Sequence, residues 1–424
     1  MPSGIALSVA ISSATPRAFR PVHPLQIEVV GSAAHRVPYW RLSGYYFFYF
    51  AFIGAFSPYF SLYLATLNFS AWDIGLLMSQ MQLMRLFGPN LWGWLADRFG
   101  QRTRIVVLAG AVSLAGFSAF FWVDRLAGML VAMAILAFFW SAALPLIETL
   151  TFDHLRAGEG EYSRIRLWGS VGFIVAVMAA GSALDVLPSN GILSICWGIL
   201  LGILLLAMTL PEAPRPKVAE ASASIRAVLT QTRVRALLAA CFAMSAAHGA
   251  FYVFYSVHLA DHGYSKTEIG LLWSLGVLAE IVIFMLMTRL NRRFSLRVIL
   301  LASFWAAVLR FVLIGWAADS IALMTFAQLL HGLTFGAYHA AAIAAVNRWF
   351  IHGTQGRGQA LYSSLSFGAG GLFGGLLAGA LWESIGGGWV FSLGSLYALL
   401  GGWLLLRWLR GDPAVDLPVG AKII

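Results

Sequence analysis

Eight ionisable side chains within apolar stretches of the chain, each about 20 to 25 residues long, are the candidates for chemistry. They are Arg85, Glu148, Arg166, His248, Glu280, Arg310, His331 and His339. In a hydrocarbon environment such a group is costly unless it faces a cavity or a partner. An arginine guanidinium suits a carboxylate, and carboxyl or imidazole groups can take up and release protons. These residue types predict a site that holds a small anion and exchanges protons.

The first group of these residues combines Arg85, Glu148 and Arg166. Glu148 lies near the end of one apolar stretch and Arg166 near the start of the next, so both can face one cavity and pair across it. A structural salt bridge without a ligand is the alternative for this pair. Over the whole chain, three such arginines are present against two such carboxylates. This surplus of positive charge favours an anionic substrate. Arg85 is a further candidate ligand, and it could equally reach carbonyl groups of another helix.

The second group combines Glu280, Arg310, His331 and His339. Away from the ends of the apolar stretches, Glu280 is the only acidic residue of the second half, which makes it the candidate proton carrier beside Arg310. His331 and His339 are eight residues apart, about two helical turns, and lie roughly on one face. The alternative for each histidine is a hydrogen-bonded interior residue. No cluster of carboxylates or thiolates of the kind that a histidine metal site normally adds accompanies them, so we expect no metal site and no cofactor.

The elements that must position these residues are twelve apolar windows, each able to cross a hydrocarbon core of about 30 Å as a helix. Hydrophobic residues make up 60% of the chain and charged residues 11%, which is too little polar surface for a soluble globule. We predict an all-α polytopic membrane protein with twelve transmembrane helices in two six-helix halves. The predicted spans are residues 43–67, 74–96, 104–123, 127–150, 164–187, 191–210, 236–260, 268–288, 297–316, 321–344, 358–382 and 387–407.

A polar segment that contains Pro, Ser and charged residues divides these spans six and six, as expected for a boundary between two halves. The predicted organisation is a disordered cytoplasmic N-terminal tail (1–38), a first half (39–210), a cytoplasmic linker (211–235), a second half (236–410) and a cytoplasmic C-terminal tail (411–424).

The positions of lysine and arginine predict the orientation in the membrane. Of the 28 basic residues, 23 fall on one side, Arg125 and Lys266 fall on the other, and three lie within spans. Because positive loops stay in the cytoplasm, both termini are expected there. Topology accounts for the net charge of +10, so we expect no nucleic-acid partner. Cys196 and Cys241 lie in apolar segments and predict neither a disulfide nor a thiolate metal site.

One polar connection carries a specific motif. Residues 93–104 read Gly-Trp-Leu-Ala-Asp-Arg-Phe-Gly-Gln-Arg-Thr-Arg, between the second and third spans. This run resembles the cytoplasmic signature loop of the major facilitator superfamily, which implies a gating role for Gly93, Asp97, Arg98, Gly100 and Arg102. Gly93 would let two helices approach closely, and Asp97 would cap or pair at a helix end beside the arginines. An ordinary basic turn is the alternative.

Further runs resemble the oligosaccharide and phenylpropionate permease branch of this superfamily. They are Glu161 to Phe173, His248 to Tyr252, Gly270 to Glu280, Arg310, Leu330 to Gly332 and Tyr338 to His339, within a resemblance that covers roughly residues 40–400. It implies that Arg166 pairs with Glu148 and binds substrate, with Phe173 in place of an aromatic residue that stacks on sugar. His248 and Tyr252 are further candidates for substrate binding, because an aromatic cluster there could flank an aromatic ring.

The resemblance breaks at one place. Where sugar permeases of this branch carry Lys, His and Glu on the tenth helix, this chain has Gln328, His331 and Thr334. The carboxylate that usually carries the coupling proton is therefore missing, and Glu280 is the expected substitute.

The predicted function is secondary transport: proton-coupled uptake of 3-phenylpropionate or a related aromatic acid by alternating access. The expected partners are a small-molecule substrate, protons and the lipid bilayer, and the expected setting is a monomer in the bacterial inner membrane. A sugar or nucleoside symporter and an efflux pump for drugs or metabolites are the alternatives within transport. The chain has no HxxxD, HExxH or GxSxG element in a plausible context, so no enzyme is expected. A sensor that kept the transporter fold would lack a soluble effector domain here.

Overall fold

The computed structural model describes residues 37–157, 161–213, 224–351, 353–410 and residue 416. Within these ranges the regular structure is helical, and no strand occurs. The predicted tails, 1–38 and 411–424, lie almost wholly outside the described residues, and so does the middle of the predicted linker, 214–223.

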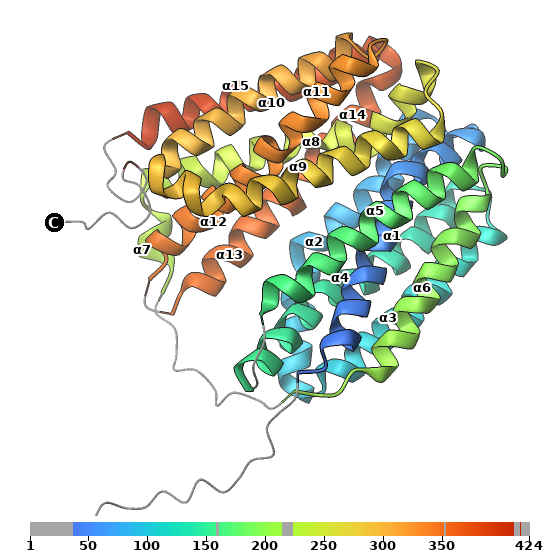
Figure 1. Ribbon diagram of the computed structural model, residues 1–424, viewed down its shortest axis with the longest axis horizontal. Coiled ribbons are helices and arrows are strands. Elements are labelled where there is room, and N and C mark those ends of the chain that lie inside the picture. Colours follow the sequence, from blue (N-terminus) through green and yellow to red (C-terminus); the bar gives the residue numbers. More distant parts are fainter. Residues whose placement is uncertain (1–36, 158–160, 214–223, 352, 411–415, 417–424) are drawn as a thin grey trace, which may run out of the picture. The chain divides into compact units, whose positions relative to one another are not determined.

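The described residues of the first half form six membrane-length helices, whose arrangement is seen in Figure 1. They are α1 (Tyr39–Thr66), α2 (Ala71–Phe99), α3 (Arg102–Ser118) with the 3₁₀ turn η1 (Ala119–Phe121), α4 (Leu126–Ala157), α5 (Tyr162–Leu184) and α6 (Gly191–Thr209). A short helix, α7 (Arg226–Leu229), precedes the second half.

The second half has the same number of membrane-length segments, and two of them are interrupted by π-helical turns. Its segments are α8 (Thr232–Asp261), α9 (Lys266–Arg293), α10 (Leu296–Trp316), the run α11 (Ile321–His331), η2 (Gly332–Ala337) and α12 (Tyr338–Trp349), the run α13 (Gln355–Ser363), η3 (Ser364–Gly370) and α14 (Gly371–Ile385), and α15 (Gly387–Trp408). Both π segments lie in the middle of a span, a position that often marks a functional site.

The predicted fold class is confirmed. Eleven of the described segments are long and apolar enough to cross a membrane, and α2, with 29 residues, is the twelfth and more polar one. Each predicted span lies mainly within one segment, but several helices run further than predicted. For example, α4 continues to Ala157, whereas the apolar pattern of the sequence ends at residue 150. A helix does not stop where hydropathy falls, because its backbone hydrogen bonds continue into the polar zone.

The two halves meet through α1 with α8, α2 with α14, and α5 with α9. We call the end of the bundle with connections 66–71, 184–191, 261–266 and 385–387 the far end, and the end that receives residues 209–232 the linker end. Glycines permit the close contact. A Cβ on Gly181 would lie 2.5 Å from the Lys266 carbonyl oxygen, and one on Gly75 would lie 2.9 Å from Gly379 Cα. Only glycine allows such an approach.

Two carboxylates at the far end cap helices of the opposite half, and we call these contacts the inter-half caps. Asp185, after α5, accepts hydrogen bonds from the backbone N–H of Lys266 (2.8 Å) and of Thr267 (3.0 Å) at the start of α9. Glu383, near the end of α14, accepts one from Ala71 N–H (2.8 Å) at the start of α2. Each cap joins a carboxylate of one half to the positive helix terminus of the other.

The two capped helices begin alike. Residues 69–79 read Phe-Ser-Ala-Trp-Asp-Ile-Gly-Leu-Leu-Met-Ser, and residues 264–274 read Tyr-Ser-Lys-Thr-Glu-Ile-Gly-Leu-Leu-Trp-Ser. Ser70 with Asp73, and Ser265 with Glu268, each form a capping box. The sequences and the caps therefore follow the same pattern in both halves.

Candidate functional site

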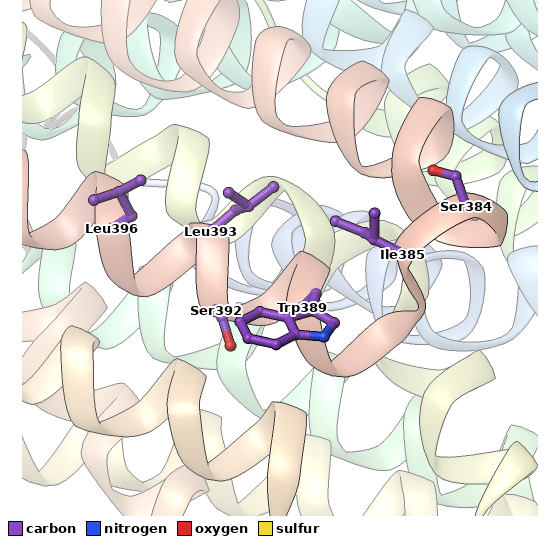
Figure 2. Close-up of a pocket in the computed structure, with 6 residues that line it drawn as sticks. All are labelled: Ser384, Ile385, Trp389, Ser392, Leu393 and Leu396. Atoms are coloured by element: carbon purple, nitrogen blue, oxygen red, sulfur yellow. The ribbon is translucent and has the colours of Figure 1, made fainter.

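The pocket in Figure 2 does not contain the predicted site. It lies along α14 and α15 near the far end and is lined by Ser384, Ile385, Trp389, Ser392, Leu393 and Leu396. Its lining is largely apolar, and Trp389 is 60% exposed on the outside of the described bundle. None of the eight ionisable residues predicted within the spans lines it. The charged site is instead defined by contacts between side chains at the centre of the helices.

Arg310 on α10 is the centre of the second-half cluster and is fully buried. Its guanidinium donates to the carbonyl oxygen of Ala327 (3.1 Å), to His248 Nε2 (3.2 Å) and to the side-chain oxygens of Thr334 and Gln328 (3.4 Å each). All of these acceptors are neutral. No Asp or Glu among the described residues lies within ion-pair distance of Arg310, so its charge has no direct counter-ion.

His248 on α8 is held in one tautomer by its two partners. Its Nδ1 is 2.8 Å from the Met244 carbonyl oxygen, which can only accept, so Nδ1 carries a proton. Its Nε2 then accepts from Arg310. A second proton on His248 would point at the guanidinium, and therefore the imidazole acts as a neutral support for Arg310.

Glu280 on α9 pairs with His331 rather than with Arg310. Glu280 Oε1 lies 2.8 Å from His331 Nε2, and both side chains are largely buried. The other ring nitrogen of His331 has no hydrogen-bond partner in the described structure. The predicted group of Glu280, Arg310 and His331 is thus brought together, with His331 as the residue that contacts the carboxylate.

His339, one of the predicted proton-coupling residues, lies further along the same span. Its Nδ1 is 2.8 Å from the Tyr362 hydroxyl oxygen of α13. It does not contact Glu280. The predicted two-turn separation from His331 on roughly one face holds, and Phe335 lies between the two rings, with ring centroids 5.6 Å and 6.0 Å away.

The first-half pair is not joined directly. Glu148 on α4 accepts a hydrogen bond from the Tyr162 hydroxyl (3.2 Å). Arg166 on α5 lies over the Phe50 ring, 3.9 Å from its centroid, and no carboxylate of the described residues is within ion-pair distance. The ion pair expected between Glu148 and Arg166 is therefore absent from this conformation, because the guanidinium packs on an aromatic face instead.

The charges of the two halves nevertheless act on each other across the interface. Arg166 lies close enough to Glu280 and to His339 for electrostatic interaction. Arg85 on α2 interacts in the same way with Tyr252 on α8, and it makes no hydrogen bond or ion pair within the described chain. Arg85 and Arg166 of the first half, which have no ion-pair partner in the described chain, therefore lie across the interface from Tyr252 and Glu280 of the second half.

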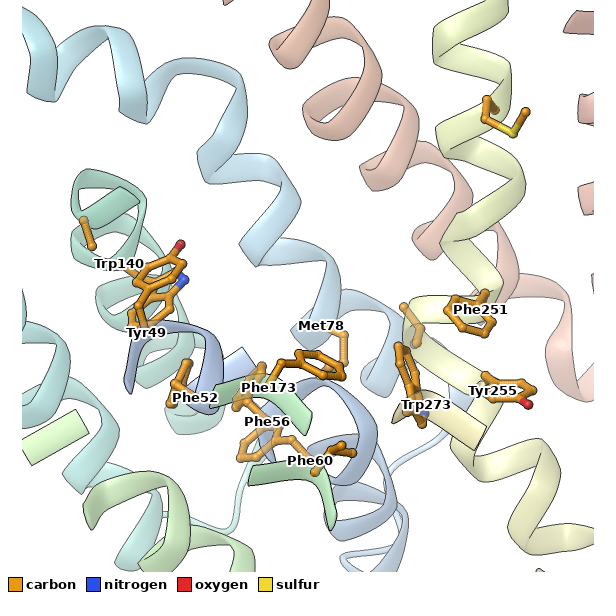
Figure 3. Packing of buried hydrophobic residues seen from close by; sticks show 14 of the residues in the cluster. Tyr49, Phe52, Phe56, Phe60, Met78, Trp140, Phe173, Phe251, Tyr255 and Trp273 are labelled. Atoms are coloured by element: carbon orange, nitrogen blue, oxygen red, sulfur yellow. The ribbon is translucent and has the colours of Figure 1, made fainter. Parts of the chain in front are cut away.

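Two predicted aromatic contacts differ in their surroundings. Phe173 on α5 is buried and faces Trp273 of α9 across the interface, with ring centroids 6.4 Å apart (Figure 3). It packs between the halves instead of lining an open cavity. Tyr252 is half-buried, and its ring centroid lies 6.0 Å from that of His248.

The motif at residues 93–104 forms an ionic cluster at the linker end. Arg102 lies 3.3 Å from the Asp97 carboxylate, and it also pairs with Asp153 of α4. Gly100 ends α2 with φ 63°, a left-handed conformation that favours glycine. Arg98 lies over the ring of Trp94 at 5.4 Å.

The close helix contact predicted for Gly93 is absent. Apart from its chain neighbours and its own helix backbone, no atom of the described residues lies within 4 Å of where its Cβ would stand. The inter-half contacts described above are at the far end, so nothing packs on this glycine in the observed conformation.

The sequence analysis gave no role to the residues that hydrogen-bond or pair with Glu148, His339, Arg102 and Arg310. Tyr162, Tyr362, Asp153 and Gln328 are neutral or loop-proximal residues with no intramembrane charge to draw attention to them. The spacing of Gln328, His331 and Thr334 does indicate one helix face, which is a signal that could have been used. The described residues contain no group of three or more His, Cys, Asp or Glu side chains arranged to hold a metal ion.

The described residues form twelve membrane-length helical segments in two contacting halves, with ionisable groups at the contact, which is the architecture of a polytopic membrane transporter. The model of the MFS_1 like family matches residues 39–393, and the chain belongs to this family of the major facilitator superfamily. Its relatives are secondary transporters that move small solutes across membranes, not enzymes.

Two relatives and one solved structure are similar to this chain. The chain is 30% identical over 373 residues to a probable 3-phenylpropionic acid transporter of Escherichia coli (strain K12), which covers 85% of this chain and 96% of that protein. It is 30% identical over 370 residues to maltose permease of Geobacillus stearothermophilus, with 85% and 92% covered. A crystal structure of a mutant of the nucleoside transporter NupG aligns with a TM-score of 0.79 at 18% identity, covering 88% of this chain and 99% of that one, and shows the shared fold alone.

Proposed function

We propose that this protein imports a small aromatic carboxylate together with protons, by alternating access. One observation carries the proposal: Arg85, Arg166 and Arg310 lie within membrane spans, and none has a carboxylate of the described chain within ion-pair distance. Arg310 is fully buried, and Arg85 and Arg166 are partly buried. Positive charge at such positions without a counter-ion favours an anionic ligand that supplies one. The relative named as a probable 3-phenylpropionic acid transporter supports an aromatic acid as that ligand.

The proposed substrate contacts are Arg166, Arg85 and Tyr252, with Glu148, Phe173 and His248 in supporting positions. Arg166 has a guanidinium face free of any acid, and it lies opposite Glu280 and His339. A substrate carboxylate would bind its fork and be held between the two halves. Rocking of the halves, proposed as residues 39–210 and 236–410 joined by 211–235, then exposes the site to one side of the membrane at a time.

Proton coupling would operate through Glu280. In its ionised form Glu280 offsets part of the positive charge of Arg166 and Arg310, which weakens the attraction for a second anion. A proton on the Glu280 and His331 pair removes that competition, so proton uptake strengthens substrate binding. Arg310, which is hydrogen-bonded to His248, would keep the Glu280 and His331 pair in a positive environment. His339 would interact electrostatically with Arg166 on the same side.

The experiment is uptake of radiolabelled 3-phenylpropionate by proteoliposomes under an imposed pH gradient. Glu280→Gln mimics the protonated carboxyl, so we expect substrate exchange to persist while gradient-driven accumulation is lost. Arg166→Ala removes the side chain proposed to bind the substrate carboxylate, and it is expected to abolish both substrate exchange and accumulation. Asp319→Asn is the matched control, because Asp319 is an exposed carboxylate outside the candidate spans, beyond the end of α10. Accumulation that survives in Glu280→Gln would refute the coupling role.

The proposed setting is a monomer in the bacterial inner membrane with both termini cytoplasmic. The basic residues at the linker end, including Arg98, Arg102 and Arg104, support this orientation. Labelling of single cysteines at the linker end from outside intact cells would contradict it.

A sugar is the second candidate substrate, because maltose permease is as similar in identity as the aromatic-acid relative. Competition between maltose and 3-phenylpropionate for binding separates the two. The unpaired arginines favour the acid, since a neutral sugar supplies no counter-charge.

A further inference from the structure

Two π-helical segments of the second half each contribute a phenylalanine to a group of four aromatic rings. The η2 segment (Gly332–Ala337) lies in the tenth span and η3 (Ser364–Gly370) in the eleventh. Phe335 of η2 and Phe367 of η3 have ring centroids 6.1 Å apart. His331 and His339 flank Phe335 along the tenth span. We call these four residues the ring cluster.

The π turn explains why the rings of His331, Phe335 and His339 form one nearly parallel stack. In an α-helix, residues four apart are offset by about 40° around the axis, so residues eight apart would diverge. The i to i+5 hydrogen bonds of η2 place more residues in a turn, which takes up this offset. The ring planes are accordingly within 21° and 15° of each other along the stack.

The ring cluster lies beside the interface between the halves. The charge of Arg166, in the first half, acts on His339 and on Glu280, the partner of His331. On η3, Ser364 donates a hydrogen bond to the Leu86 carbonyl oxygen of α2 (3.2 Å), so this segment touches the first half. Phe335, His339 and Phe367 are partly exposed rather than buried. A closed packing cluster would leave no such surface at its centre.

We propose that the ring cluster is the binding site for the aromatic ring of the substrate, and that Phe335 and Phe367 set the preference for an aryl over a saturated ring. This inference rests on the proposed function, because it assigns the ring end of the same aromatic carboxylate whose acid end binds Arg166. Edge-to-face and offset contacts between aromatic rings form at centroid separations of about 4.5 to 7 Å, the range found within the cluster.

The test compares 3-phenylpropionate with 3-cyclohexylpropionate, which has the same chain and charge and a saturated ring. Binding of each acid to the purified full-length protein is measured by competition against radiolabelled 3-phenylpropionate. The wild-type protein is expected to prefer the phenyl compound by about 2- to 12-fold, the range given by one aromatic contact. Phe335→Leu and Phe367→Leu keep an apolar side chain and are expected to bring this ratio close to one.

Phe326→Leu is the matched control, because Phe326 lies on the same span, in α11, and is 45% exposed outside the cluster. It should leave the ratio unchanged. A wild-type ratio near one, or an unchanged ratio in both cluster variants, would overturn the ring-binding site while the transport of carboxylates stands. Failure of the folded wild-type protein to bind either acid would overturn the proposed function as well. A monodisperse elution profile for each variant establishes that it is folded.

Discussion

Removal of the Asp185 cap is expected to open the far end of the transporter. Asp185 accepts hydrogen bonds from two backbone N–H groups and from the Thr267 hydroxyl (2.5 Å) at the start of α9. These bonds join the two halves, so they exist only while the far end is closed. Asp185→Ala removes all of them without changing either helix elsewhere.

The magnitude follows from the geometry of the cap. Loss of an N-cap side chain costs about 1 kcal/mol, and loss of a charge at an exposed helix N-terminus costs about 0.3 to 1 kcal/mol. Asp185 is exposed, which keeps the charge term small. A total of about 1 to 2 kcal/mol shifts the balance of closed and open forms by about 5- to 30-fold. Glu383→Ala, which removes a single bond to Ala71, should shift it less.

The assay is a distance measurement between spin labels by pulsed electron resonance. Labels at Val186→Cys and Ile321→Cys report on the two halves, because both side chains are exposed and flank the far end. The native Cys196 and Cys241 are free but buried, and are expected to react slowly with label. A growing fraction of long distances in Asp185→Ala is the expected result. An unchanged distance distribution would refute the view that this cap holds the halves together.

Two further predictions concern the far-end contacts, and a third concerns the hydrogen bond between His248 and Arg310. Burial alone would raise the pKa of Asp185, but the hydrogen bonds from Thr267 and Lys266 outweigh it and hold the pKa below its usual value of 3.8, so the cap should persist from neutral pH down to about pH 4 and fail only below it; opening between pH 6 and 5 in the same distance measurement would contradict this. Gly181→Val should favour the open far end, because its Cβ would meet the Lys266 carbonyl at 2.5 Å, and an unaltered distance distribution would count against that packing. His248→Leu leaves one N–H of Arg310 without its acceptor and should lower the free energy of unfolding by about 1 to 3 kcal/mol, whereas an equal thermal midpoint would show that the hydrogen bond is dispensable.

Much of the candidate site could be anticipated from residue type, because charge inside an apolar span is rare and costly. In the structure Glu280 Oε1 lies 2.8 Å from His331 Nε2, and both residues belonged to the predicted coupling group. The direct pair of Glu148 and Arg166 was inferred from their positions in adjoining spans, and the structure lacks it. A guanidinium has several partners within reach of its long stem, so linear spacing does not select one.

The class of the protein and the order of its helices follow from the linear pattern of residues. Apolar runs of membrane length admit only helices, since every backbone polar group must be satisfied within the segment. The signature at residues 93–104 likewise lies in a short local stretch and can be read without a structure.

Which distant side chains come into contact depends on the packing of the folded helices. Asp185 and Thr267, or Phe335 and Phe367, lie on different helices, and their contact depends on how those helices cross and rotate. The π turns that align the ring cluster leave no simple mark in hydropathy, because they change the number of residues per turn and not the composition. The rotation of each helix is set by the packing of many side chains at once. The geometry of the site therefore cannot be predicted from the sequence pattern.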